Sequence, residues 1–267
     1  NSFFAVGAHW AGNRTVRLLQ TSDIGSFPGM HQLQFKGEYP FGWYAFEDAE
    51  FPLDAELCAY NPLIPMDLKN SSLPCAIYQI HVRNTAAQPV EASLLATQPN
   101  AVGYDGYSPL EGDHFRRNAG YGNNRNEVIT RESRTSIAMT GTGGSMVLSL
   151  YESDVSSTAA WHSIESLYRQ FEADLAVDGP WQAASPHGGV TVDGALAKRF
   201  TLHPGECKTL TVVLSWHMPN GSFGMSNIPG WSFTGSMYDN WFADALDVDR
   251  YVHAHFHYLS TSTQKFH

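Results

Sequence analysis

The densest group of potential metal ligands in this chain is His253, His255 and His257. On a strand, alternate histidines point the same way and can hold zinc. Here the surrounding apolar residues recur with a helical period, which places His253 and His257 on one face and His255 elsewhere. A helical pair needs at least one more ligand, and the glutamate of an H-E-x-x-H motif is absent. We therefore predict no metal site and no cofactor, and interpret these histidines as half-exposed helix side chains.

Other residue types that support catalysis lack the partners that the chemistry needs. Cys75 has no histidine nearby in sequence, so a small buried side chain is a better interpretation than a nucleophile. Glu47, Asp48 and Glu50 could supply a glycosidase carboxylate pair, but they lie at a predicted strand edge without a specific spacing. No G-x-S-x-G elbow, P-loop or dinucleotide-binding motif is present. We predict a scaffold without a catalytic residue, and the sequence identifies no substrate-binding residue.

The stretch 59–74, AYNPLIPMDLKNSSLP, is apolar and bracketed by prolines, and we call its residues 61–74 the arch. Proline removes a backbone donor and favours extended geometry before it, so no regular helix is predicted to run through the arch. Loops are usually polar, so a loop that contains Leu63, Ile64 and Met66 needs a cover. The arch is either a strand that crosses between two sheets over the core or a segment that another domain covers.

The composition limits the class of protein. The chain has 267 residues, of which 43% are hydrophobic and 13% aromatic, enough for one large core. Only 16% are charged, which suits a sugar-contacting surface or a large interdomain interface. The net charge of −10 argues against a nucleic-acid partner. We predict no membrane span, because no run of about 18 apolar residues exists.

Cysteine is sparse and irregularly spaced, which does not indicate a disulfide framework. The three cysteines are Cys58, Cys75 and Cys207. They favour a reducing compartment, so we expect a cytoplasmic protein. Triplets that fit the N-glycosylation pattern begin at Asn13, Asn70 and Asn220, but such triplets are frequent by chance and decide nothing here.

Most of the chain is predicted to be β-strand. Alternating apolar and polar residues with β-branched side chains, bounded by Gly, Pro and Asn, are the strand signal. It is clearest at 76–83, 90–97, 145–151 and 209–216. Such strands without a βαβ rhythm predict a mainly β fold, a two-sheet antiparallel β-sandwich. The Gly- and Asn-rich segment 99–130 predicts a long surface loop, either functional or a disordered insertion.

Two segments show helical spacing instead. Residues 161–175 carry the apolar stripe of an amphipathic helix, and Gly179-Pro180 is expected to end it. Residues 237–259 predict a second, long helix near the end of the chain. Several aspartates, Asp249 among them, fall near its start, where carboxylates favour the positive end of the helix dipole.

Four motifs in order carry a resemblance to a known family. They are GEYP at 37–40, NPLIP with SSLP at 61–65 and 71–74, WHMP at 216–219, and YDNWF at 238–242. Together they resemble the N-terminal domain of glycoside hydrolase family 116, the family of bile-acid β-glucosidase (non-lysosomal glucosylceramidase). The resemblance covers nearly the whole chain and is weakest at 99–145 and 177–200.

The resemblance implies a β-sandwich joined by helical linkers to a C-terminal (α/α)6 barrel. It implies a retaining β-glycosidase acting on β-glucosides, with a Glu nucleophile and an Asp acid/base. Both would lie in the barrel, so no catalytic residue is carried over and the chain alone is expected to be inactive. The expected division is a sandwich over 1–235, and a helix and linker towards the barrel over 236–267. The glycine-rich first strand of the family is missing here.

On this resemblance, the arch is a docking element whose apolar side chains the barrel covers, and its serines and aspartate close their own backbone. The docking residues expected are Leu63, Ile64, Met66, Trp216, His217, Tyr238 and Trp241. The partner would be the barrel of the same protein and, through it, a β-glucoside. The rival hypothesis is a free-standing carbohydrate-binding or structural β-sandwich, in which exposed aromatic rings stack on sugars. A reading frame that continues into a barrel would support the first, and a stop codon the second.

Overall fold

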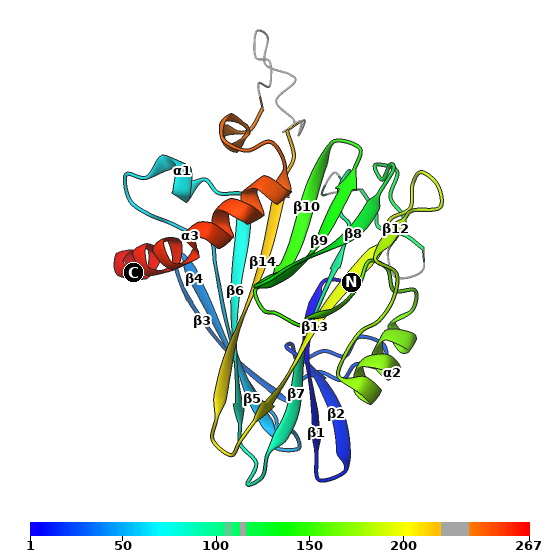
Figure 1. Cartoon of the computed structure of the whole chain (residues 1–267), viewed down its shortest axis with the longest axis vertical. Coiled ribbons are helices and arrows are strands. Elements are labelled where there is room, and N and C mark those ends of the chain that lie inside the picture. Colours follow the sequence, from blue (N-terminus) through cyan, green and yellow to red (C-terminus); the bar gives the residue numbers. More distant parts are fainter. Residues whose placement is uncertain (105, 107, 113–115, 220–234) are drawn as a thin grey trace.

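Two antiparallel sheets stack into a sandwich in the computed structural model, which describes residues 1–104, 106, 108–112, 116–219 and 235–267 (Figure 1). The five-stranded sheet has the order β11 (Ser156–Thr158), β13 (Asp193–Leu202), β7 (Val90–Pro99), β1 (Phe3–Trp10) and β2 (Asn13–Leu18). The nine-stranded sheet has the order β12 (Gln182–Ala184), β8 (Arg125–Arg131), β9 (Arg134–Gly141), β10 (Gly144–Leu150), β14 (Cys207–His217), β6 (Cys75–Asn84), β5 (Leu53–Tyr60), β4 (Phe41–Glu47) and β3 (Gln32–Glu38). The predicted mainly β sandwich is confirmed, and its four clearest predicted strands are β6, β7, β10 and β14.

The main core lies between the two sheets and follows from side-chain alternation. In β6, Ile80 and Val82 are fully buried, while His81 between them is exposed on the other face. From the facing sheet, Val6 and Ala8 of β1 join the same buried cluster. A one-residue slip in register would expose this apolar set, so the alternation fixes the register.

The helix α2 (Ile164–Asp174) covers the outer face of the five-stranded sheet, where Phe171 is fully buried against β1. Its start is fixed by Ser163, whose hydroxyl accepts a hydrogen bond from the backbone N–H of Ser166 at 3.1 Å. The predicted end at Gly179-Pro180 is wrong, because Leu175 turns left-handed (φ 51°) and closes the helix earlier. A Cβ on Gly7 would lie 2.5 Å from Cδ2 of the Leu175 side chain, so a larger residue at position 7 would force that side chain to shift.

The long helix predicted over 237–259 is interrupted. A short 3-10 helix, η2 (Met237–Asn240), is followed by α3 (Ala245–Phe266), which crosses the outer face of the nine-stranded sheet over β10 and β14 (Figure 1). Asp244 starts α3 by accepting a hydrogen bond from the backbone N–H of Asp247 at 2.8 Å. No helix among the described residues is both long and apolar enough to cross a membrane.

The aspartate at position 249 does not serve the helix dipole as expected. Its carboxyl group is fully buried between α3 and the sheet and lies 3.2 Å from the guanidinium of Arg134 on β9. Burial raises the pKa of Asp249, and the Arg134 charge opposes that rise. This residue therefore fixes where α3 sits on the sheet.

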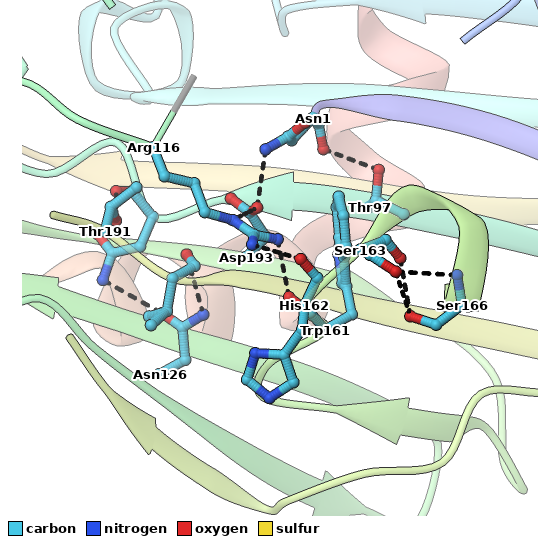
Figure 2. Close-up of polar contacts among 12 residues, drawn as sticks. Asn1, Thr97, Arg116, Asn126, Trp161, His162, Ser163, Ser166, Thr191 and Asp193 are labelled. Atoms are coloured by element: carbon cyan, nitrogen blue, oxygen red, sulfur yellow. Dashed lines mark hydrogen bonds and ion pairs between the residues drawn. The ribbon is translucent and has the colours of Figure 1, made fainter. Parts of the chain in front are cut away.

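The glycine-rich segment predicted as a loop over 99–130 is shorter than expected, because β7 ends at Pro99 and β8 begins at Arg125. Figure 2 shows how Arg116 fastens this loop to the sandwich. Arg116 forms an ion pair with the buried Asp193 of β13 and donates to the backbone carbonyls of Trp161 at 2.7 Å and His162 at 2.8 Å. Its guanidinium also lies 4.7 Å from the centre of the Trp161 ring. This part of the loop is thus anchored at a buried carboxylate.

We predict that Arg116→Ala lowers the free energy of unfolding by about 3–5 kcal/mol, because it removes the guanidinium from the buried Asp193 carboxylate and leaves only the Asn1 side chain, at 2.7 Å, and the N-terminal ammonium beside it. Urea denaturation of the purified variant measures this. Arg131→Ala, which removes an exposed arginine from β8, is the matched control and should stay within about 0.5 kcal/mol of the wild type. Equal effects of the two substitutions would contradict the anchoring role of Arg116.

Candidate domain-docking face

The arch connects β5 to β6, which are neighbours in one sheet with Tyr60 opposite Ile77. The crossing-strand interpretation is therefore wrong, because the arch never leaves the nine-stranded sheet. No regular helix runs through the arch, as predicted, although the one-turn helix α1 (Leu68–Ser71) fits between Pro65 and Pro74. Residues there keep their backbone N–H groups, so a single turn costs no hydrogen bond.

Polar side chains of the arch form hydrogen bonds to the arch's own backbone groups, as expected. The Ser71 hydroxyl accepts from the N–H of Ile64 at 2.9 Å and donates to the Ile64 carbonyl at 2.8 Å. Asp67 caps α1 by accepting from the N–H of Asn70 at 3.1 Å, and the Asn70 side-chain amide donates to the same carboxylate at 2.7 Å. These contacts make the arch a preformed ridge rather than a loose loop.

The helix α3 supports the arch from within the chain. Three α3 side chains bond to it: Tyr251 to Asn70 at 3.0 Å, Tyr258 to Asp67 at 3.3 Å, and Thr263 to the Leu63 N–H at 3.1 Å. The Lys69 ammonium lies 4.2 Å from the centre of the Tyr251 ring. Much of the cover that the apolar sequence requires is thus supplied by this chain itself.

Apolar side chains of the arch divide into a supported base and an exposed tip. Leu63 and Ile64 are half-buried. Ile64 packs against the buried cluster beneath α3, which includes Ile77, Val213 and Leu259. Met66, at a positive φ of 66°, is fully exposed, and Leu68 is 61% exposed. Met237 of η2, whose sulfur lies 3.8 Å from Ser72 of the arch, is 49% exposed. We name Met66, Leu68 and Met237 the exposed tip.

Sequence reasoning missed two of the three tip residues. Leu68 lies in the same apolar loop as Met66, so the loop's composition carried a signal for it. Met237 carried no such signal, because it comes from a segment about 170 residues away in sequence that only the fold brings to the arch.

The four expected docking residues outside the arch make contacts within the chain. The buried His217 imidazole lies 2.9 Å from the Phe242 carbonyl, and the ring edge of Tyr238 packs against it with centroids 5.5 Å apart. Trp216 is half-buried against the main core, and Trp241 against the cluster under α3. They tie the end of β14 to η2. The segment 220–234, with the Asn220 triplet, lies outside the described residues.

The three histidines of the HAHFH run lie on α3 and have separate surroundings. The His253 ring lies 3.2 Å from the Ser133 hydroxyl, and His255 stacks on Tyr251 with centroids 4.1 Å apart. His257 is exposed. Burial lowers the pKa of His253. Within the described part of the chain, no group of three or more His, Cys, Asp or Glu residues is placed to hold a metal ion.

The carboxylates considered for catalysis also separate in the structure. Glu47 and Glu50 are exposed, whereas the Asp48 side chain is fully buried. Burial alone would raise the pKa of Asp48, but hydrogen bonds from Arg17, at 2.6 Å, and from the N–H of Glu50 outweigh it and hold that pKa below its usual value. His31 lies 3.0 Å away on the other oxygen. Asp48 therefore joins three segments of the fold, and Cys75 is a buried core residue as interpreted.

A family model matches almost the whole chain. Residues 3–259 match the N-terminal domain described as "beta-glucosidase 2, glycosyl-hydrolase family 116 N-term". No curated protein matches the sequence.

Some solved structures are similar to this chain at low sequence identity. A bacterial glucoamylase complexed with acarbose has 10% identity and a TM-score of 0.48, with 82% of this chain and 27% of that chain covered. A putative kojibiose phosphorylase from human microbiome has 9% identity and a TM-score of 0.41, with 98% and 26% covered. A galactose mutarotase related enzyme from Lactobacillus acidophilus has 8% identity and a TM-score of 0.39, with 79% and 78% covered. This chain thus spans about a quarter of the glucoamylase and phosphorylase chains.

We predict that Asn70→Ala raises the pKa of Asp67 towards its usual value of about 3.9, because the Asn70 side chain is the largest cause of its lowered pKa. The lowered pKa means that Asp67 stabilises the fold above the unfolded pKa, and that this contribution is lost as the pH falls through the folded pKa. NMR titration of the Asp67 carboxyl carbon measures the change. Asn240→Ala, in the exposed part of η2, should leave the Asp67 pKa unchanged. An Asp67 pKa at the usual value in the wild type would refute the prediction.

Proposed function

We propose that this chain, which belongs to the family of N-terminal domains of glycosyl-hydrolase family 116, is the non-catalytic β-sandwich of a retaining β-glycosidase. The match over residues 3–259 carries this proposal. The substrate is a β-glucoside, and the chemistry belongs to a Glu nucleophile and an Asp acid/base in a partner (α/α)6 barrel. The role of the sandwich is to brace that barrel. The expected division at residue 235 stays part of this proposal.

The exposed tip is the surface that we assign to the barrel. Met66 and Leu68 form an apolar projection on a ridge whose backbone is already satisfied, so docking costs little ordering entropy. Exposed large apolar side chains also continue along α3 at Tyr258 and Phe266. Apolar surface gathered in this way is typical of an interaction site.

The remaining expected docking residues act beneath this surface. Ile64 packs the base of the arch, the Leu63 N–H bonds to Thr263 of α3, and His217 bonds to the Phe242 carbonyl just after η2. Trp216, Tyr238 and Trp241 complete this support. We propose that these six residues position the tip, while Met66 touches the barrel directly.

We further propose a cytoplasmic protein. All three cysteines are free: Cys58, Cys75 and Cys207. Free thiols, one of them exposed, suit a reducing compartment. Fluorescence microscopy of the tagged gene product in its own host tests this, and secretion into the medium would contradict it.

We predict that the purified 267-residue chain does not hydrolyse nitrophenyl β-glucoside. The reason is that the carboxylates considered for catalysis do not form a suitable pair, because Asp48 is buried against Arg17 while Glu47 and Glu50 are exposed. A spectrophotometric assay of released nitrophenol measures turnover. Turnover that a single substitution within the chain abolishes would show that the sandwich carries the activity.

We predict that Met66→Arg lowers the stability of a gene product that contains both domains by about 2 kcal/mol or more, because it places a charge in an apolar interface. In the 267-residue chain the same substitution should leave the melting temperature unchanged, since Met66 is fully exposed there. Differential scanning calorimetry of both proteins measures the two effects. Trp181→Arg, at an exposed site on the far edge of the nine-stranded sheet, is the control. No difference between Met66→Arg and Trp181→Arg in the two-domain protein would contradict docking at the tip.

A further inference from the structure

The outer face of the nine-stranded sheet changes character along its strands. One row across the sheet is apolar and lies under α3: Phe41, Tyr60, Ile77 and Val213. The next rows on the same face are mixed and polar: Trp43, Cys58, Gln79 and Thr211, then Ala45, Glu56, His81 and Thr209. Since α3 already covers the apolar row, the polar rows are the part of this face that remains open.

These open rows form a groove of about 480 Å³ beside the C-terminal turns of α3. We name it the β3–β6 groove, after the strands that form its floor. Its outward-facing lining residues include Gln34, Lys36, Trp43, Glu56, Gln79 and His81, and Gln264 of α3 forms one wall. This size falls within the range of about 300–1,000 Å³ that small-molecule sites occupy.

Three carboxamide side chains, Gln34, Gln79 and Gln264, line the β3–β6 groove without a hydrogen bond to any described part of the chain. Each offers two N–H donors and a carbonyl acceptor in one plane. The His81 ring is held by Thr209, with its Nδ1 2.6 Å from the threonine hydroxyl, which leaves Nε2 available to a ligand. The groove thus presents several paired donors and acceptors.

An ordered aromatic ring lies among these polar groups. The Trp43 indole is stacked on its strand neighbour Phe41 with ring centroids 5.2 Å apart, and it meets the His267 ring at the end of α3 with centroids 5.0 Å apart, so contacts with two rings fix its orientation. Lys36 lies over the ring at 5.5 Å, and its side chain is 68% exposed, so a ligand can displace it at small cost. Pyranose rings have an apolar C–H face and hydroxyl groups at their edges, which suits an indole bordered by carboxamides.

The charges in the groove balance. Lys36 and Glu56 are opposite charges, and burial raises the pKa of the Cys58 thiol to about 11, so this floor residue stays uncharged at neutral pH. An anionic ligand would gain nothing here, and the net charge of −10 on the chain would repel it. A protein partner would need an apolar centre, and the apolar row of this face is occupied by α3.

We propose that the β3–β6 groove binds a neutral, glucose-type oligosaccharide, with its hydroxyl groups bonded to Gln34, Gln79 and Gln264 and a sugar ring against Trp43. Glucose units suit the groove because their equatorial hydroxyls leave both ring faces flat and apolar. This binding belongs to the sandwich itself and does not rest on the proposed function.

Titration of the isotope-labelled chain with cellohexaose and with maltohexaose, followed by NMR, tests the proposal. We expect the Trp43 indole signal to shift with at least one hexamer, at a dissociation constant on the order of 1 mM or below. Gln79→Ala should weaken binding about threefold to tenfold, the effect of one lost hydrogen bond. Glu56→Gln keeps the shape of the groove and should bind the hexamer with at most a small change.

Trp181→Ala is the matched control, because Trp181 is another exposed tryptophan but lies beside β12 at the opposite edge of the sheet. It should bind as the wild type does. Trp43→Ala should abolish binding, and Gln79→Ala covers the case in which that variant fails to fold. The proposal is overturned if neither hexamer shifts any signal, if a heparin hexasaccharide binds in preference to both, or if Trp181→Ala rather than Gln79→Ala weakens binding.

Discussion

The packing of α3 on the outer face of the nine-stranded sheet is the interaction on which the arch, η2 and the end of β14 depend. A strand sends side chains to both faces, and the core between the sheets buries only one of them. On the other face Ile77 and Val213 would be exposed without α3, yet both are fully buried beneath it together with Val252 and Leu259. The arch, η2 and the end of β14 all take their positions from this helix.

Two buried ion pairs then specify where the added segments sit. Asp249 with Arg134 fixes α3, and Asp193 with Arg116 fixes the loop between β7 and β8. A buried pair adds little stability over a well-packed apolar replacement, but losing one partner is costly. Misplacing either segment separates its pair, so these charges contribute to the choice of one arrangement more than to stability.

One sheet face serves two purposes because its composition changes between neighbouring rows. The row from Phe41 to Val213 is apolar and suits a permanent cover, whereas the row from Trp43 to Thr211 mixes an indole with amide and hydroxyl groups. The first is satisfied inside the chain, and the second stays hydrated until a ligand arrives. The exposed tip of the arch lies above the covered row, so the proposed docking surface and the β3–β6 groove lie on either side of α3.

The sequence by itself determined the strands, the sandwich class, the amphipathic helix near residue 165 and the family resemblance, because alternation, helical periodicity and ordered motifs are local signals. The self-closure of the arch by Ser71 and Asp67 was also predictable, since short polar side chains bond to nearby backbone. Only the tertiary structure decided the rest. From the sequence, Asp249 was interpreted as a helix-dipole residue, but the structure pairs it with Arg134 of the sheet. Asp48 was considered as a catalytic carboxylate, but in the structure it is buried and paired with Arg17. The arch needed a cover, but no local pattern could state that α3, almost 200 residues later, supplies it, because such a contact depends on which faces the whole fold leaves unpaired.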